Sequence, residues 1–78
     1  MPRVNLGQTE REREIIAAIR EMFGRNYINL AEVGKFIGLK PDAAKRVMVG
    51  CPCLKMGRSY RFAAPDVAKV IARMEVSA

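Results

Sequence analysis

Glycine and proline punctuate the middle of this 78-residue chain and limit what it can fold into. In the stretch LAEVGKFIGLKPDAAKRVM, residues 30–48, Gly38 suits the left-handed position that follows a helix. Pro41 suits the first turn of the next helix, where its missing N–H has no partner to lose. Gly50 then closes that second helix. The spacing predicts two short helices joined by a tight turn, with the second helix over 41–49.

The apolar positions of this stretch fit a helix-turn-helix. Gly34 is small and precedes Gly38 by about one turn, where the second helix would cross the first closely. Asn29 can cap the first helix, with Glu32 at the third position of its opening turn. A generic helical hairpin of a small bundle is the alternative, but it does not require this register of apolar residues. The register consists of Val33, Ile37, Leu39, Ala44 and Val47.

Apolar and basic residues alternate around a glycine in LKMGRSYRF, residues 54–62, which is typical of a β-hairpin. A two-residue turn at the glycine would mix apolar and basic side chains on one face. A three-residue loop over 57–59 keeps the faces separate and places Lys55 opposite Arg61, so we predict this loop. The inner face would consist of Leu54, Met56, Tyr60 and Phe62.

The N-terminal part of the chain predicts an arm and a helix. Residues 1–8 would form a flexible arm. Thr9 and Glu12 then fit a capping box, in which each side chain binds a free backbone N–H of the other residue. Apolar residues recur at helical spacing from there to Gly24, so we expect a helix over 10–23.

The C-terminal part predicts a last helix. Pro65 and Asp66 suit its first turn, where a missing N–H and a negative charge are both favourable. Its apolar stripe would pack back on the helix-turn-helix and close the core. Residues 9–78 would then form one domain, mainly α with a small two-stranded hairpin. The stripe consists of Val67, Val70, Ile71 and Met74.

The net charge of +6 is concentrated in one segment. Residues 40–61 carry six Lys or Arg against one acid, whereas residues 1–26 carry five Arg against four Glu. A concentrated basic stripe is typical of a protein that binds a polyanion. The alternative is a solvated basic surface that keeps the protein soluble.

The order of helix, turn, helix, basic hairpin and helix is that of a winged helix-turn-helix. Over residues 29–74 the chain resembles the excisionase-type branch of the MerR-like winged-helix family. This resemblance implies a small sequence-specific double-stranded DNA-binding protein, an excisionase-like or regulatory factor of a phage or mobile element. It also implies a recognition helix in the major groove and wing contacts to the backbone or minor groove. The residues that carry it are Ile37-Gly38-Leu39, Met56-Gly57-Arg58, Tyr60-Arg61-Phe62 and Asp66-Val67.

Within this interpretation the recognition helix, 41–49, offers side chains for distinct roles. Arg46 is the first candidate for reading a base edge, because its planar fork matches guanine O6 and N7. Lys40 and Lys45 would contact phosphates, which position a domain without reading sequence. Ala43 would touch a thymine methyl group. Asp42 could accept from cytosine, but stabilising the start of the helix is the preferred interpretation.

The wing, 54–62, would grip the DNA backbone through Lys55, Arg58, Ser59 and Arg61, with Arg58 at the tip entering the minor groove. About five phosphate contacts give a log–log salt slope of about −4 to −5. One small module buries little surface and binds weakly. We therefore expect a dimer, adjacent copies on DNA or a second DNA-bound protein.

Other functions fit the same fold. One is a protein–protein interaction module, because winged domains can dock proteins through the same surfaces. Another is a phage terminase or packaging small subunit, which would grip genome ends and assemble with a large motor subunit. RNA binding is disfavoured, because the sequence predicts no exposed aromatic pair for base stacking.

Composition argues against several further classes of protein. The chain has no histidine, paired-carboxylate pocket or phosphate loop, so we expect no enzyme activity. Cys51 and Cys53 cannot supply the four ligands of a structural zinc site and are expected to be reduced and partly buried. No apolar run approaches a membrane span, and the N-terminus lacks a signal-peptide core. We expect a cytoplasmic protein with no cofactor or small-molecule ligand.

Overall fold

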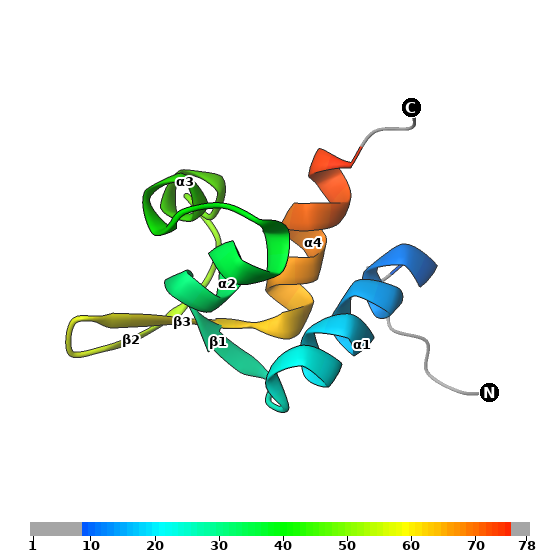
Figure 1. Cartoon of the computed structure of the whole chain (residues 1–78), viewed down its shortest axis with the longest axis horizontal. Coiled ribbons are helices and arrows are strands. Elements are labelled where there is room, and N and C mark those ends of the chain that lie inside the picture. The colour runs from blue at the N-terminus through cyan, green and yellow to red at the C-terminus, as the bar shows by residue number, and fades with distance from the viewer. Residues whose placement is uncertain (1–8, 76–78) are drawn as a thin grey trace.

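Residues 9–75, which the computed structural model describes, form four helices and a small antiparallel sheet (Figure 1). This confirms the mainly helical prediction and is compatible with a winged helix-like fold. The predicted arm over 1–8 lies outside the described residues. None of these helices is long and apolar enough to span a lipid bilayer. In chain order, the elements are α1 (Glu10–Phe23), β1 (Tyr27–Asn29), α2 (Leu30–Ile37), α3 (Pro41–Val47), β2 (Leu54–Met56), β3 (Ser59–Ala63) and α4 (Ala64–Met74).

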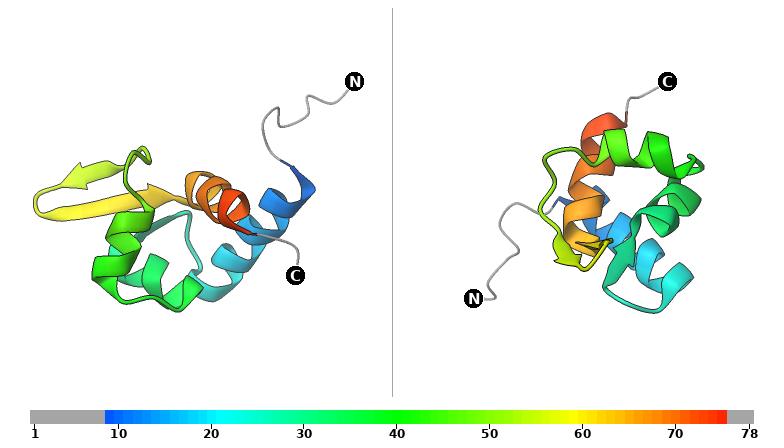
Figure 2. Two further views of the ribbon diagram at one scale, coloured as in Figure 1. Left: turned by 90° about the horizontal axis from the view of Figure 1, so that it is seen from above. Right: turned by 90° about the vertical axis from the view of Figure 1, so that its left-hand side faces the viewer.

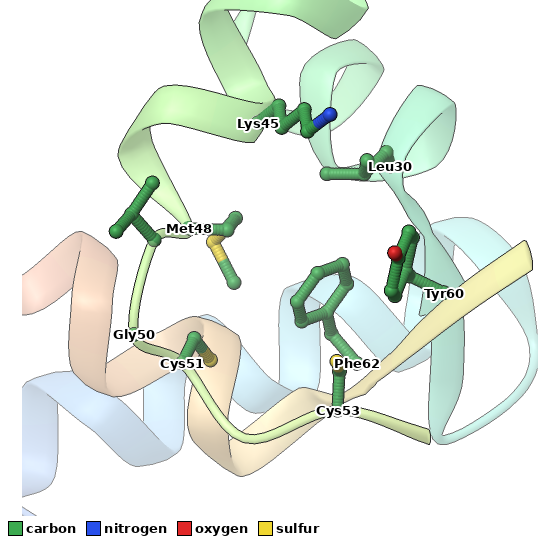
Figure 3. Close-up of a pocket in the computed structure, with 9 residues that line it drawn as sticks. Leu30, Lys45, Met48, Gly50, Cys51, Cys53, Tyr60 and Phe62 are labelled. Atoms are coloured by element: carbon green, nitrogen blue, oxygen red, sulfur yellow. The ribbon is translucent and has the colours of Figure 1, made fainter. Parts of the chain in front are cut away.

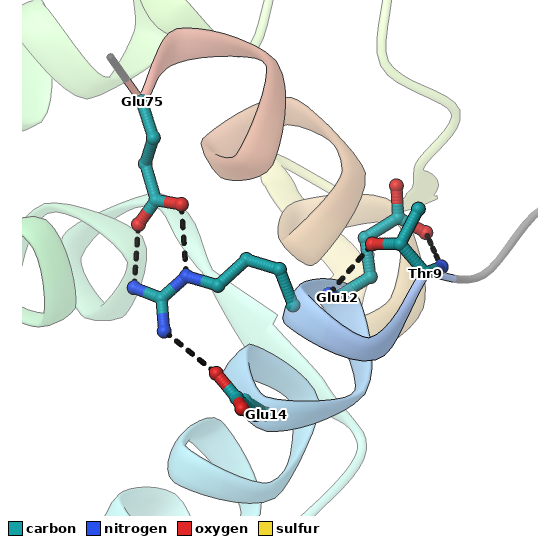
Figure 4. Close-up of polar contacts among 5 residues, drawn as sticks. Thr9, Glu12, Glu14 and Glu75 are labelled. Atoms are coloured by element: carbon teal, nitrogen blue, oxygen red, sulfur yellow. Dashed lines mark hydrogen bonds and ion pairs between the residues drawn. The ribbon is translucent and has the colours of Figure 1, made fainter. Parts of the chain in front are cut away.

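The first helix, α1, begins at the predicted capping box. The Thr9 hydroxyl accepts a hydrogen bond from the Glu12 N–H at 3.1 Å, and the Glu12 carboxylate accepts one from the Thr9 N–H at 3.2 Å (Figure 4). These bonds satisfy N–H groups for which the first helical turn has no partner. Gly24 ends the helix with a φ of 71°. The predicted helix over 10–23 is therefore confirmed.

The last helix, α4, has α1 as its main partner, not the helix-turn-helix as predicted (Figure 1). The reason is the apolar stripe of α1, where Ile15, Ile16 and Ile19 are buried and need apolar neighbours. Val67 and Ala68 of α4 are fully buried in the same core cluster. The pair of helices therefore forms one layer of the domain, and α2 and α3 form another part.

An ion pair joins the exposed ends of α1 and α4. The Arg11 guanidinium donates to both carboxylate oxygens of Glu75, at 2.8 and 2.6 Å, and to Glu14 at 3.0 Å (Figure 4). These hydrogen bonds hold the pKa of the Glu75 carboxyl below its usual range. Because both partners are solvent-exposed, the pair orients the helix ends and contributes little stability.

The turn between α2 and α3 depends on two glycines. Gly38 has a φ of 77°, which side chains rarely adopt. Gly34 leaves no room for a side chain, because an added Cβ would lie 2.4 Å from the Leu39 carbonyl oxygen and 3.6 Å from Ala44 Cβ. The Leu39 N–H also donates to the Gly34 carbonyl at 2.7 Å. The predicted close approach at Gly34 is confirmed, and the backbone of the turn comes nearer to it than α3 does.

The helix predicted over 41–49 is α3, which ends at Val47, two residues earlier than predicted. Met48 follows with a φ of −91° and a ψ of 8°, and its N–H still donates to the Ala44 carbonyl four residues earlier, at 3.0 Å, whereas the next N–H, of Val49, donates to the Arg46 carbonyl only three residues earlier. Its side chain is 3% exposed, whereas Val49 is 79% exposed. Gly50 then has a φ of 83°. Met48 is therefore buried in the core, and the last turn that the sequence predicted is not helical.

The wing has a different register from the one predicted. Met56 pairs with Ser59 and Lys55 with Tyr60, so the hairpin has a two-residue turn, and Lys55 is not opposite Arg61. Gly57, with a φ of 63°, occupies the first turn position, where tight hairpins favour glycine. The predicted register assumed that Leu54 and Met56 face the core, but they are 48% and 61% exposed. Burial specifies register only where one face is covered, and this part of the wing projects beyond the core.

A third strand, β1, was not predicted. It pairs with β3, so the sheet has the order β1-β3-β2, and Ile28 faces Phe62 across the pair. Ile28 is fully buried and Phe62 nearly so. The Ala64 N–H also donates to the Asn26 carbonyl at 2.7 Å. Three residues are too few to show alternation in a sequence, so only the pairing reveals this strand.

The Gly34→Ala substitution tests the tight turn. We expect it to destabilise the domain by about 1–3 kcal/mol, since the new methyl group must displace backbone atoms of Leu39. Urea unfolding followed by circular dichroism measures this change. Gly38→Ala is the matched control, because a Cβ there meets nothing within 4 Å and only the left-handed backbone is penalised, by about 1 kcal/mol. An unchanged or raised urea midpoint for Gly34→Ala would contradict the close approach.

Candidate nucleic-acid interface

The recognition helix and the wing lie at the same end of the molecule. In the left view of Figure 2, α3 and the β2–β3 hairpin lie at one end of the molecule, and α1 lies at the other end against α4. The first helix therefore does not cover the surface between α3 and the wing. A single face is available to the basic side chains of both elements.

The exposed side of α3 carries most of its predicted contacts. Lys40 precedes the helix as its N-terminal cap residue without a side-chain capping bond, and Lys45 and Arg46 are exposed on the helix itself. Asp42 is also exposed, in the first turn, where its charge suits the helix dipole. Ala43 is half-buried at the edge of the core-facing side. Four of the five predicted positions thus share the exposed surface, and Ala43 is turned partly away from it.

The wing divides its cations between two faces. Residues paired across strands share a face, so Lys55 and Tyr60 face the same side as the buried Phe62, toward α3. The Lys55 ammonium lies 6.0 Å from the centre of the Tyr60 ring, at the limit of a cation–π contact. Arg58 occupies the turn and is exposed.

The two other predicted wing contacts, Ser59 and Arg61, lie on the opposite face of the sheet. Ser59 pairs with Met56 and Arg61 with Leu54, so both side chains point away from α3. Arg61 is also half-buried. The structure therefore places Lys55 on the face toward α3, Arg58 in the exposed turn, and Arg61 on the opposite face. This difference follows directly from the two-residue turn.

A groove runs between α3 and the wing (Figure 3). Met48 and Phe62 form its floor, Lys45 and Tyr60 stand on opposite walls, and Leu30 closes one end. Its volume is about 200 Å³. Small-molecule sites usually enclose about 300–1,000 Å³, so the groove is smaller than a typical ligand pocket. We call it the α3–wing groove.

Two thiols, Cys51 and Cys53, line the same groove and were not predicted to lie there. Both are free; Cys51 is half-buried, and Cys53 is exposed rather than partly buried as predicted. Burial raises the pKa of the Cys51 thiol, and the charges of Asp66 and Cys53 raise it further. Within residues 9–75, no group of three or more His, Cys, Asp or Glu could hold a metal ion.

Ion-paired and unpaired charges are distributed unevenly over the domain. Carboxylates pair with cations away from the groove, as Arg11 does with Glu14 and Glu75, and Arg25 with Glu32. In the described part of the chain, by contrast, no ion pair engages any cation of α3, its preceding turn or the wing tip. Those cations are Lys40, Lys45, Arg46, Lys55 and Arg58. An unpaired basic surface of this kind attracts polyanions.

Comparisons of the chain with protein-family models, with curated proteins and with solved structures gave no match. The geometry of the site therefore has to carry the functional argument.

The two thiols give a chemical test of the groove. We expect iodoacetamide to alkylate Cys53 faster than Cys51, because Cys53 is exposed, whereas burial and the raised pKa leave less reactive thiolate at Cys51. Mass spectrometry of the Cys51→Ser and Cys53→Ser variants gives the two rates separately. Faster alkylation of Cys51 would show that the loop between α3 and β2 has another arrangement.

Proposed function

We propose that this protein binds double-stranded DNA, with α3 in the major groove and the wing tip on the adjacent backbone. The support comes from one observation: α3, the turn before it and the wing carry five exposed cations that no ion pair engages in the described part of the chain, and these elements lie at the same end of the molecule. A major groove about 12 Å wide admits a helix such as α3. The wing then reaches the flanking phosphates.

The side chains divide into reading and positioning roles. Arg46 is the exposed guanidinium of α3 and offers a bidentate match to guanine. Lys45 lines the α3–wing groove, and the Lys55 ammonium lies 6.0 Å from the centre of the Tyr60 ring on its other wall, so both would contact phosphates of a strand that passes along the groove. Arg58 would reach the backbone or minor groove from the turn. Arg61 has no part in this contact surface, because it lies on the other face of the sheet.

The residues that resemble excisionase-type proteins favour a role as an excisionase-like or regulatory factor of a phage or mobile element. The same surface would serve a packaging subunit that grips genome ends. A genome-end partner would involve a large motor subunit, whereas an excisionase-like factor would act on an internal site. Selection of bound fragments from random duplexes distinguishes a defined internal site from end binding.

A duplex titration at several salt concentrations tests the proposal. Five phosphate contacts predict a log–log slope of about −4 to −5, measured by fluorescence anisotropy. Lys45→Gln and Lys55→Gln should each weaken binding to all sequences and make the slope shallower by about 1. Arg20→Gln on α1 removes the same charge from a side chain that bonds Asn26, away from the groove, and should leave the slope unchanged. Absent or salt-insensitive binding would contradict DNA binding by this surface.

Arg46→Ala tests base reading separately. We expect it to reduce the preference for a selected site over a scrambled duplex by about 1–3 kcal/mol, because a bidentate base contact is lost. Competition binding at fixed salt measures this preference. Arg58→Ala is the comparison variant and should weaken both duplexes equally. If Arg58→Ala removes the preference and Arg46→Ala does not, the wing reads the sequence and α3 anchors the protein.

A further inference from the structure

The sheet has a second face that the proposed DNA contact does not use. In this register, every second residue of each strand points to this face, which is turned away from α3 and the groove. We call it the back face. It consists of Tyr27, Asn29, Leu54, Met56, Ser59, Arg61 and Ala63.

The back face carries exposed apolar side chains beside polar ones. Tyr27, Leu54 and Met56 are 44%, 48% and 61% exposed, although large apolar side chains on a sheet normally face a core. A hollow of about 160 Å³ opens between Tyr27, Leu54 and Ala63, with Asp66 of α4 at its edge. Tyr, Met and Arg are the residue types enriched in protein interfaces, and all three occur on this face.

A charged group lies unsatisfied in the middle of this apolar surface. The Arg61 Nε is buried and has no hydrogen-bond partner. A buried N–H without an acceptor is costly, and a guanidinium especially favours a carboxylate. Ala63, two residues beyond Arg61 on the same face of the strand, lines the hollow that Asp66 borders, so Arg61 and Asp66 lie toward the same side of the sheet. Nevertheless, no ion pair joins Arg61 and Asp66 within one copy.

A face that carries one cation, one anion and exposed apolar side chains can be complementary to the same face of a second copy that is related by a two-fold axis. In a two-fold symmetric contact, residue i of one copy meets residue j of the other, and j meets i in return. Arg61 of each copy would then meet Asp66 of the other, while Tyr27, Leu54 and Met56 lose their exposure to water. The second copy then supplies a carboxylate to the terminal nitrogens of the Arg61 guanidinium, which, unlike Nε, are not fully buried.

We propose that the back face is a homodimer interface, in which Arg61 pairs with Asp66 of a second copy across an apolar contact. This inference does not rest on DNA binding. The contact leaves α3 and the wing groove free, because they occupy the other side of the sheet. The sheet has only three short strands, and so small an area gives a dimer that dissociates readily on dilution.

Charge reversal in two variants tests the pairing. Arg61→Glu and Asp66→Lys should each abolish self-association, since each variant opposes like charges across the symmetric contact. Their equimolar mixture should form a one-to-one heterodimer, because the acidic position 61 of one variant meets the basic position 66 of the other. Sedimentation velocity over a concentration series measures the apparent mass, which for the wild type should rise from 8.7 kDa toward twice that value.

Substitution at exposed apolar positions provides a second test, because such positions lie outside the folded core. Met56→Asp lies on the back face near the wing tip, and it should raise the dimer dissociation constant at least tenfold. Val49→Asp is the matched control, because Val49 is more exposed than Met56 but lies outside the back face. This variant should leave self-association unchanged. Circular dichroism checks that each variant is folded.

Defined outcomes overturn the proposal. A wild-type protein that stays monomeric at every concentration removes the interface. A dimer that survives both Arg61→Glu and Met56→Asp has its contact elsewhere. Failure of the mixed charge variants to associate, while each is folded, excludes the Arg61–Asp66 pairing. None of these results depends on whether the protein binds DNA, which the salt titration decides separately.

Discussion

The approach of Gly34 to the backbone of the following turn is the constraint on which the interface depends. Leu39 can return so close to α2 only because position 34 has no side chain, and this fixes where α3 starts. The direction of α3 then determines where Lys45 and Arg46 emerge. A shift of the turn would move every cation of the helix relative to the wing. Affinity for a rigid duplex is sensitive to such a shift, because phosphate contacts need fixed positions.

Charge segregation connects this geometry with function. Four acids outside α3 and the wing are used within the domain, in capping boxes and ion pairs: Glu12, Glu14, Glu32 and Glu75. Glu12 and Glu32 accept hydrogen bonds from backbone N–H groups, and Glu32 and Glu75 pair with arginines of other elements. In the described part of the chain, the same bonds that hold the helices in place leave the five cations of α3, its preceding turn and the wing outside any ion pair, with Asp42 as the acid of α3. Folding and attraction of a polyanion are therefore served by one distribution of charge.

Local signals in the sequence were sufficient for most helices and insufficient for the sheet. Thr9, Gly24, Asn29 and Gly38 mark helix ends through interactions within a few residues, so α1 and α2 could be predicted closely. The wing register depends on whether Leu54 reaches a core, and a sequence does not show how far a hairpin projects. Strand β1 and the α1–α4 contact are long-range pairings. The location of Cys51 and Cys53 in the groove was missed for the same reason. The two-residue register, by contrast, would have been enough to place Lys55 beside Tyr60.

Strand β3 belongs to both the core and the wing. Its Phe62 end is buried against Ile28, whereas its Ser59 end and all of β2 are exposed. The hairpin is therefore anchored to the core at the Phe62 end of β3, whereas its tip projects from the domain. The outer half can open and close with little effect on the rest of the domain, since few buried contacts would be lost. In the proposed DNA complex, this attachment would let the wing tip adjust to grooves of different width while the buried end of β3 keeps its orientation to α3.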